Sequence, residues 1–337
     1  MQGNAGGGFS VDLPYVWQYN ENFTHTVYVN GSSFAENSLF GFVVDGHFAR
    51  VNITYSKFLQ NTCYKGVLAL KGMEKEFFIY DNEILGNTGT YVVEFDTDSQ
   101  SHILGSVSAY FEYNRVQENR HVLHARASQS RAYQPESYTI AVRGLQKVNI
   151  THNLLGGNEM DYELLAGLFT SRIDNYLNAE ANWWGSSDPQ VIEERIFDFD
   201  DWNNYALADY LPYLTGDSLR AAVSIVRTTS IEAQTINLDA LGGRLTEDLR
   251  LPKRATPYTV VSDLTVMPGV TLLVEPGAVL EFYPSVGVLV LGRLEARGRK
   301  DDRIVFRPVD TSTASQYRWV EFVLLFLCLF FITIIAL

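Results

Sequence analysis

Hydrophobic and polar positions repeat along the chain in five short segments of similar pattern. They are VYVNGSSFAEN (27–37), VNITYSKFLQN (51–61), FFIYDNEILGN (77–87), AYFEYNRVQEN (109–119) and VNITHNLLGGN (148–158). Each opens with two apolar residues two positions apart, the periodicity of a strand with one buried face. Successive segments start 24, 26, 32 and 39 residues apart. A constant core with growing loops is typical of solenoid coils, since a longer surface loop costs little extra closure entropy.

Aligned on one another, the five segments place apolar side chains in columns. Stacked coils bury such a column between them, at about 1.5–3 kcal/mol for each large side chain. The pattern predicts an all-β fold, a right-handed parallel β-helix of the pectin-lyase-like kind. An antiparallel β-sandwich with chance spacing of asparagines is the alternative. The three columns are Val27, Val51, Phe77, Ala109 and Val148; Val29, Ile53, Ile79, Phe111 and Ile150; and Phe34, Phe58, Ile84, Val116 and Leu155.

Polar residues recur at two bends of each segment. An amide at the same bend of every coil can bond its copy in the next coil, as in stacked parallel strands. Asparagine also tolerates the left-handed backbone of a sharp corner. We therefore predict structural ladders. One bend carries Ser32, Ser56, Asn82, Asn114 and Asn153, and the other carries Asn37, Asn61, Asn87, Asn119 and Asn158.

Four Asn-X-Ser/Thr sequons begin at Asn22, Asn30, Asn52 and Asn149, and Asn61 begins a weaker Asn-Thr-Cys. Asn52 and Asn149 occupy the same repeat position, between two inward columns, so both are predicted to face outward. Asn30 is also outward in this register. Outward sequons suit a secreted or luminal glycoprotein, and we predict glycosylation at these sites.

The repeats are followed by ANWWGSSDPQVIEERIFDFDDWNNYALADYLPYL (181–214). Asp188 is predicted to cap a helix that starts at Pro189 and runs to about Phe197. Trp183 and Trp184 offer apolar area to seal the stack. NWWG, then DP, a short helix, I-x-D-x-x-D and Y-x-P-Y-L resemble the closing segment of β-helix domains in the Bark beetle (Anakonda) family. Similar closing segments occur in bacterial surface β-helices. The resemblance covers most of residues 20–308.

The remaining residues divide into shorter regions. Residues 1–19 are predicted to be an irregular N-terminal segment, 20–214 the β-helix with its closing segment, and 215–241 a connector. Residues 242–310 carry Pro-Gly turns between alternating apolar residues, and predict the opening coils of a second, truncated β-helix. Residues 321–337 are predicted to be a C-terminal apolar helix, either a membrane span shorter than the ~30 Å hydrocarbon core or an artefact of gene prediction.

Composition narrows the classes of partner. The chain has 337 residues, 46% of them apolar, and a net charge of −13. An acidic surface disfavours nucleic acid. The two cysteines, Cys63 and Cys328, exclude a disulfide scaffold, since Cys328 lies in the apolar tail. No cofactor is predicted, and the predicted partners are other cell-surface proteins or glycans, with the membrane added if the tail is a span.

Candidate chemistry is sparse, and the main prediction is that the chain is not an enzyme. Asp198, Asp200 and Asp201 are weak candidates for a calcium site, with capping and turn roles as the alternative. His121 and His124 lack the further ligand that a zinc site needs. A polysaccharide lyase of this fold would pair an acidic calcium site with a basic residue. The nearest candidates are Asp96 and Asp98, with Arg115 or Arg126 as the base.

The family resemblance implies a function as well as a fold. Members of the family are very large single-pass proteins of septate and tricellular junctions. By resemblance the chain is expected to be a structural or adhesion ectodomain fragment at the cell surface, in cell-cell junctions. The scavenger-receptor cysteine-rich and lectin-like modules expected in full-length relatives are absent from the sequence. A carbohydrate-binding or polysaccharide-cleaving β-helix is the alternative. Exposed aromatics such as Tyr110 and Tyr113 could form a sugar-stacking strip, but ordinary filling of the β-helix surface is the favoured interpretation.

Overall fold

The computed structural model describes residues 1–13, 25–63, 66–97, 108–121, 137–168, 175–202, 205–226, 237–283, 286–309 and 333–334. The chain divides into two compact units. The first contains the described residues up to Phe199 together with residues 205–226. The second contains residues 200–202 and the described residues from 237 onward. Apart from one short helix, α1 (Pro189–Glu193), the described elements are strands.

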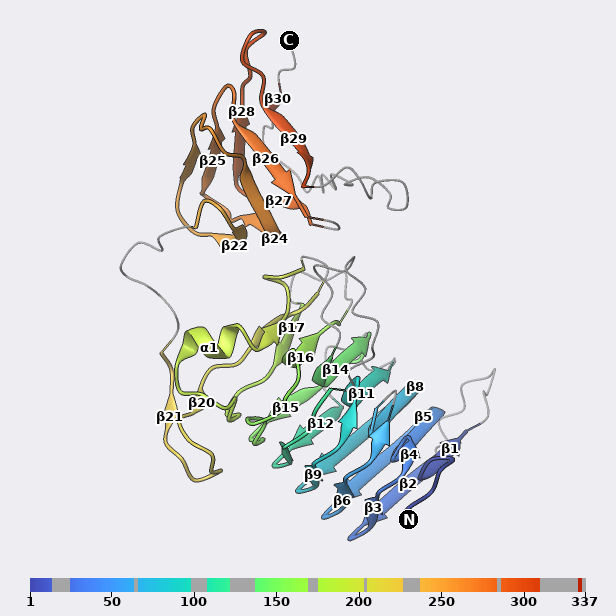
Figure 1. The fold of residues 1–337 in the computed structure, drawn as a ribbon. Coiled ribbons are helices and arrows are strands. Elements are labelled where there is room, and N and C mark those ends of the chain that lie inside the picture. Colours follow the sequence, from blue (N-terminus) through green and yellow to red (C-terminus); the bar gives the residue numbers. More distant parts are fainter. Residues whose placement is uncertain are drawn as a thin grey trace. The chain divides into compact units, whose positions relative to one another are not determined.

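Parallel sheets that share successive coils build the first unit, and Figure 1 shows their strands side by side. Almost every strand pairs with the equivalent strand one coil away, which defines a parallel β-solenoid. The largest sheet contains β1 (Phe9–Asp12), β2 (His25–Asn30), β5 (Phe42–Thr54), β8 (Leu68–Tyr80), β11 (Tyr91–Thr97), β12 (Ala109–Glu112), β14 (Tyr138–Gly144), β15 (Asn149–Thr151), β16 (Tyr162–Ala166) and β18 (Ile196–Phe197).

Shorter strands complete each coil of the first unit. One four-stranded sheet contains β3 (Ser33–Ala35), β6 (Lys57–Leu59), β9 (Glu83–Leu85) and β13 (Arg115–Gln117). A three-stranded sheet contains β4 (Ser38–Leu39), β7 (Thr62–Cys63) and β10 (Thr88–Gly89), and β17 (Tyr176–Asn178) pairs with β19 (Leu207–Asp209). Only β20 (Tyr213–Leu214) and β21 (Val223–Ser224), among the described pairs of named strands, run antiparallel.

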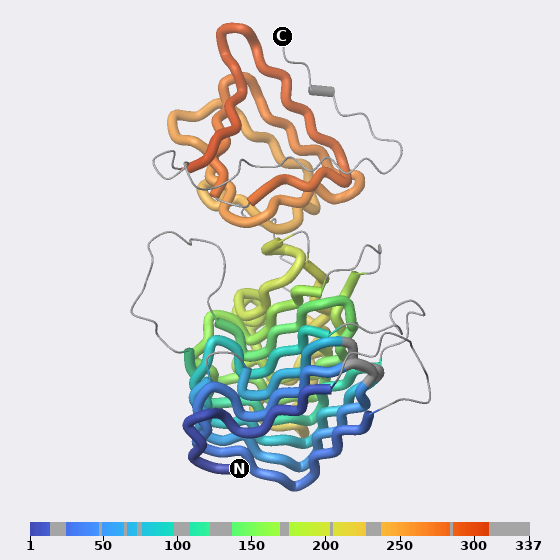
Figure 2. The backbone as a smooth tube through the Cα atoms, turned by 90° about the vertical axis from the view of Figure 1, so that its right-hand side faces the viewer, coloured from blue at the N-terminus to red at the C-terminus, as the bar shows by residue number. Residues whose placement is uncertain are grey.

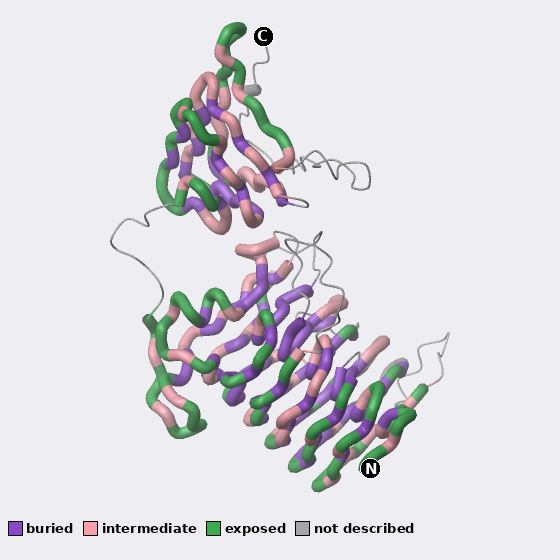
Figure 3. Tube along the Cα trace, viewed as in Figure 1, coloured by how far each residue is buried: buried purple, intermediate pink, exposed green. Residues whose placement is uncertain are grey.

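The predicted apolar columns are confirmed by the strand register. Val29 lies opposite Ile53, Ile53 opposite Ile79, and Phe111 opposite both Ile79 and Ile150. Ile53, Ile79, Phe111 and Ile150 are fully buried and belong to one continuous core. Figure 2 shows the coils stacked in sequence order, and Figure 3 shows buried residues recurring along the strands. Each coil therefore uses its neighbours to bury an apolar face that it cannot bury alone.

The left-handed backbone at the corners lies one residue earlier than predicted. The residue just before the ladder asparagine takes the positive φ, as at Gln60 (φ 53), Glu118 (φ 59) and Tyr113 (φ 58). Gly86 and Gly157 occupy the same corner in other coils, with φ 65 and 88. The ladder asparagines themselves are not among the described residues with a positive φ, and their amides reach the next coil within the stack. Side chains before them turn outward at the corner.

The closing segment forms the predicted helix, but the helix ends at Glu193 rather than near Phe197, because Ile196 and Phe197 pair as strand β18 with β16. The Asp188 carboxylate accepts a hydrogen bond from the Gln190 N–H at 3.0 Å, and Pro189 is the first helical residue. Its fixed φ suits that position, where the missing N–H has no helical partner to lose. Trp184 is 2% exposed and joins the apolar core, whereas Trp183 is partly exposed. Trp184 and helix residue Ile192 therefore contribute apolar area to this end of the core.

The second unit is a smaller parallel stack with its own core, which includes Leu264, Leu272 and Leu280. One sheet contains β22 (Leu241–Leu245), β24 (Tyr258–Val266), β26 (Val279–Phe282), β27 (Val288–Val290) and β29 (Val305–Pro308). The other contains β23 (Leu249–Leu251), β25 (Thr271–Val274), β28 (Arg293–Ala296) and β30 (Thr333–Ile334). Its strands pair coil to coil, as in the first unit.

The predicted C-terminal helix over residues 321–337 is not shown. In that range only Thr333–Ile334 is described, as strand β30 paired with β28, and the rest lies outside the described residues. Among the residues that the structure describes, none forms a helix long and apolar enough to cross a membrane.

Gly72 lies at a bend of β8 where only glycine fits. Its φ is +93, and a Cβ there would stand 2.3 Å from the carbonyl oxygen of Gly46 on the neighbouring coil. We expect Gly72→Ala to lower the free energy of unfolding of the first unit by about 2–3 kcal/mol, from backbone strain and the clash together. The matched control is Gly31→Ala, where φ is +56 but no atom lies within 4 Å. Urea denaturation measures both, and equal losses would contradict the prediction.

Candidate functional site

The first polar ladder runs through the interior as a chain of asparagine amides. The Asn61 Nδ2 donates to the Asn87 Oδ1 at 3.0 Å, Asn87 donates to Asn119 at 2.9 Å, and Asn119 donates to Asn158 at 2.9 Å. Asn4, which sequence reasoning missed, starts the series with a 2.9 Å bond from its Nδ2 to the Asn37 Oδ1. Asn37 in turn donates to Asn61 at 2.9 Å. In each donor asparagine, the backbone N–H and the side-chain Nδ2 both donate to the same Oδ1 of the next asparagine in the ladder. The ladder thus satisfies polar groups that would otherwise be buried without partners.

The second ladder follows the other bend. Asn82 donates to Asn114 at 2.9 Å, Asn114 to Asn153 at 3.1 Å, and Asn153 to Asn182 at 3.0 Å. Ser56 joins it through its N–H to the Asn82 Oδ1, at 2.8 Å. Sequence reasoning missed Asn182, the asparagine of the NWWG motif. It lies 29 residues after Asn153, so extending the repeat by one coil would have found it.

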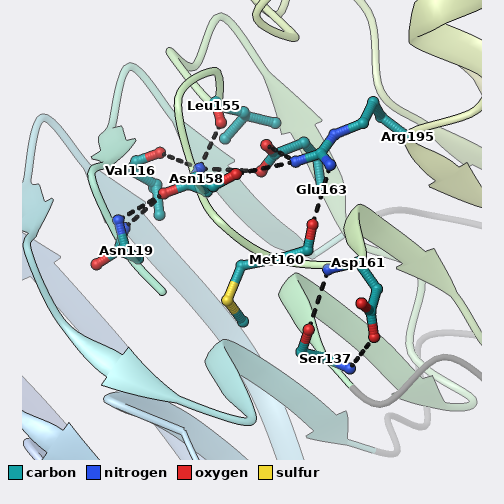
Figure 4. Close-up of polar contacts among 9 residues, drawn as sticks. All are labelled: Val116, Asn119, Ser137, Leu155, Asn158, Met160, Asp161, Glu163 and Arg195. Atoms are coloured by element: carbon teal, nitrogen blue, oxygen red, sulfur yellow. Dashed lines mark hydrogen bonds and ion pairs between the residues drawn. The ribbon is translucent and has the colours of Figure 1, made fainter. Parts of the chain in front are cut away.

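The first ladder ends on an ion pair rather than on another amide (Figure 4). The Asn158 Nδ2 donates to the Glu163 Oε2 at 2.9 Å, and the Glu163 Oε1 lies 2.6 Å from the Arg195 guanidinium. Arg195 also donates to the carbonyls of Met160 and Asn158, at 2.9 and 3.1 Å. The Glu163 side chain is 1% exposed and that of Arg195 is 27% exposed.

Two opposing effects set the pKa of Glu163. Burial disfavours the carboxylate and raises the pKa above its ordinary value, and the charge and hydrogen bonds of Arg195 oppose that rise. Sequence reasoning missed this pair, because a glutamate in a strand and an arginine 32 positions later carry no shared motif. The ion pair ends the first ladder. Glu163 accepts the hydrogen bond of the last amide, Asn158, and Arg195 compensates the buried carboxylate charge of Glu163.

An exposed row of aromatic rings crosses the outer face of the strands, and we call it the outer aromatic strip. Phe78 stacks on Tyr80 with ring centroids 5.4 Å apart, and Tyr113 stacks on His152 at 4.9 Å. Tyr28 is 64% exposed and Phe78 is 36% exposed. Rings on adjacent coils contact because the register aligns them. The strip consists of Tyr28, Tyr55, Phe78, Tyr80, Tyr110, Tyr113 and His152.

Two of the sequon asparagines lie in the same column as three rings of this strip. Tyr28 pairs with Asn52, Asn52 with Phe78, Phe78 with Tyr110, and Tyr110 with Asn149. Asn30 lies two residues after Tyr28, at the end of β2. Its Nδ2 donates to the Tyr28 hydroxyl and to the Thr54 Oγ1, at 3.2 and 3.1 Å. Asn61 is a fully buried ladder residue. Asn22 lies outside the described residues.

The weak calcium candidates do not gather. Asp198 is buried in the first unit, and its Oδ2 accepts a hydrogen bond from the Ala208 N–H at 2.8 Å. Asp200 and Asp201 are assigned to the second unit, where the Asp200 Oδ1 lies 2.8 Å from the Arg244 Nε. In the part of the chain that the structure describes, no group of three or more His, Cys, Asp or Glu residues is arranged to hold a metal ion. His124 lies outside that part.

The candidate lyase residues are placed on different faces where they are described. Asp96 is on β11, paired between Lys71 of β8 and Arg143 of β14. Arg115 is on β13, which belongs to a different sheet, and its Nε donates to Gln117 at 2.5 Å. The register places Asp96 beside these two cationic residues, although the Lys71 Nζ pairs with the Glu94 carboxylate, at 3.2 Å, and the Arg143 guanidinium lies over the Tyr91 ring. Asp98 and Arg126 lie outside the described residues.

These features define a parallel β-solenoid whose coils are joined internally by asparagine ladders. No family model and no solved structure matches the chain. A comparison with known proteins shows that it is 41% identical, over 320 residues, to Protein bark beetle of Drosophila melanogaster. The aligned region covers 92% of this chain and 10% of that relative. The chain belongs to the bark beetle family, and it spans about a tenth of the length of this relative.

Proposed function

We propose that this chain is a non-catalytic structural part of a large cell-surface protein that helps to organise cell-cell junctions. The observation that carries the proposal is the 41% identity to Protein bark beetle along nearly the whole chain. The resemblance of the closing segment to that of a family of septate- and tricellular-junction proteins supports the same role. In this role the solenoid presents rigid, extended surfaces to proteins or glycans of the same or a neighbouring cell.

The internal structure supports a role in display rather than in chemistry. Two ladders of buried amides and a continuous apolar core join successive coils. Deforming one coil against the next would break several buried hydrogen bonds at once, so the outer faces keep a fixed geometry. Such a surface suits a partner that contacts several coils together.

Localisation tests the proposal directly. Antibodies raised against the purified chain are applied to intact epithelial cells that express the full-length protein, without permeabilisation. We expect labelling concentrated at cell-cell contacts, and loss of that labelling when the gene is silenced. Labelling that appears only after permeabilisation, or that is spread evenly over the cell surface, would contradict the proposal.

The polysaccharide-cleaving alternative has its own assay. The purified chain is incubated with pectin, alginate and glycosaminoglycans, with and without calcium, and new reducing ends and unsaturated products are measured. The proposal expects no turnover above that of heat-denatured protein. Turnover that Asp96→Asn abolishes would replace it with an enzymatic function.

A further inference from the structure

We propose that the N-linked glycans of Asn52 and Asn149 fold back on the outer aromatic strip, so that their first sugar rings stack on Phe78 and Tyr110. The inference rests on the extracellular placement proposed above and adds to it an intramolecular carbohydrate site. The ligand is the chain's own glycan, and the contact is between an aromatic face and the apolar C–H face of a pyranose.

The register brings the components together. Asn52 on β5 lies opposite Phe78 on β8, and Asn149 on β15 lies opposite Tyr110 on β12. Adjacent strands are about 4.8 Å apart, so a sugar bonded to either amide nitrogen starts within one strand spacing of a ring. Phe78 and Tyr110 are themselves neighbours, with centroids 6.5 Å apart. The two sequons thus bracket one aromatic pair from opposite sides.

The Asn52 amide is oriented for attachment. Its Oδ1 is buried and makes no hydrogen bond within the described residues, although the residue as a whole is partly exposed. The other amide atom, Nδ2, is not among the fully buried side-chain atoms that lack a hydrogen bond in the described part of the chain. That nitrogen is the atom that carries an N-linked glycan. By contrast, the Asn30 Nδ2 is engaged by Tyr28 and Thr54.

The strip has the chemistry that a sugar face needs. Phe78 is 36% exposed on the outer face and has no polar tip to satisfy in water, and Tyr28 on the other side of Asn52 is 64% exposed. A pyranose laid on these rings removes apolar area from water on both partners. Because the glycan is tethered next to the rings, it binds at a high effective concentration.

A double-mutant cycle tests the contact. The full chain is produced through a secretory pathway as wild type, Asn52→Gln, Phe78→Ala and the double variant, and mass spectrometry establishes occupancy of Asn52 and Asn149. We expect loss of the glycan to raise the unfolding equilibrium constant about three- to tenfold in wild type and less than about twofold in Phe78→Ala. Phe78→Leu, which keeps an apolar side chain without a ring, replaces Phe78→Ala if that variant does not fold.

The matched control uses the same four proteins made without glycans in the bacterial cytosol. There the coupling between positions 52 and 78 is expected to vanish. Equal coupling in both forms would show a direct contact between the two side chains and overturn the inference. Occupied sequons with no coupling would overturn it while leaving the proposed function intact. Sequons that stay empty in secreted protein would overturn the inference and also remove the support that the sequons give to an extracellular placement.

Discussion

Asn119→Ala is expected to lower the free energy of unfolding of the first unit by about 3–6 kcal/mol. Asn119 is fully buried, and its Oδ1 accepts from the Asn87 N–H and Nδ2. Its own Nδ2 donates to the Ile84 carbonyl and to the Asn158 Oδ1. The substitution removes all four hydrogen bonds, although the Asn87 Nδ2 keeps its bond to the Phe58 carbonyl and the Asn158 Oδ1 keeps the one from the backbone N–H of residue 119. The expected loss therefore lies below the sum for four wholly unsatisfied groups, each of which costs about 1–3 kcal/mol. Equilibrium denaturation in urea measures the loss.

Two further variants separate the ladder from a general effect of losing an asparagine. Asn119→Asp keeps the acceptor but cannot donate at neutral pH, so we expect it to be at least as destabilising as alanine at pH 7. Asn52→Ala, in unglycosylated protein, removes an amide that makes no hydrogen bond within the described residues, and is expected to cost less than about 0.5 kcal/mol. A loss below about 1 kcal/mol for Asn119→Ala would mean that the ladder does not stabilise the stack.

Arg195→Ala is expected to destabilise the first unit by about 3–5 kcal/mol at neutral pH, because it leaves the buried Glu163 carboxylate without its cation. The Arg50–Glu76 pair, with an N–O distance of 2.6 Å and both side chains about half exposed, is the matched control. Its rupture by Arg50→Ala should cost less than about 1 kcal/mol, since water replaces the lost partner. Comparable losses at the two sites would contradict this account of Glu163.

The loss in Arg195→Ala is expected to depend on pH with a defined sign. Burial raises the folded-state pKa of Glu163, and without Arg195 the main opposing charge is gone. A folded pKa above the unfolded value stabilises the protein below the unfolded value, about 4.3 for glutamate, and the stability falls as pH rises through the folded pKa. The variant should therefore approach wild type in acid and fall away from it toward neutral pH. Arg195→Ala combined with Glu163→Gln should show no such trend relative to wild type.

The ladder positions were largely predictable from the sequence because each coil repeats the same contact. A polar residue that stacks on its own copy must recur at one place in every coil, and five copies of the pattern reveal it despite offsets from 24 to 39 residues. The corner geometry was predicted one residue too late, since Asn61 and Asn119 looked like corner residues. In the structure, Gln60 and Glu118 take the left-handed backbone, and composition gives no sign that they do.

The ion pair at the end of the ladder was not predictable in the same way. Glu163 and Arg195 lie after the five repeated segments, so neither residue has an equivalent in another repeat that would reveal its role. The outer aromatic strip was predictable in part: less than the ladders, but more than the ion pair. Tyr110 and Tyr113 were visible as exposed aromatics, but their alignment with Phe78, Tyr80 and His152 depends on which coil lies beside which.

The sequence by itself determined the β-solenoid architecture, the apolar columns and the asparagine rows. Strands of period two and polar bends are local properties, and the same pattern recurs in every coil. The tertiary structure alone decided where the first ladder ends and which outward side chains share a face. Those features depend on the pairing of particular strands, such as β5 with β8 and β12 with β15. The end of the ladder also depends on the burial of Glu163, which exists only once the coils have stacked.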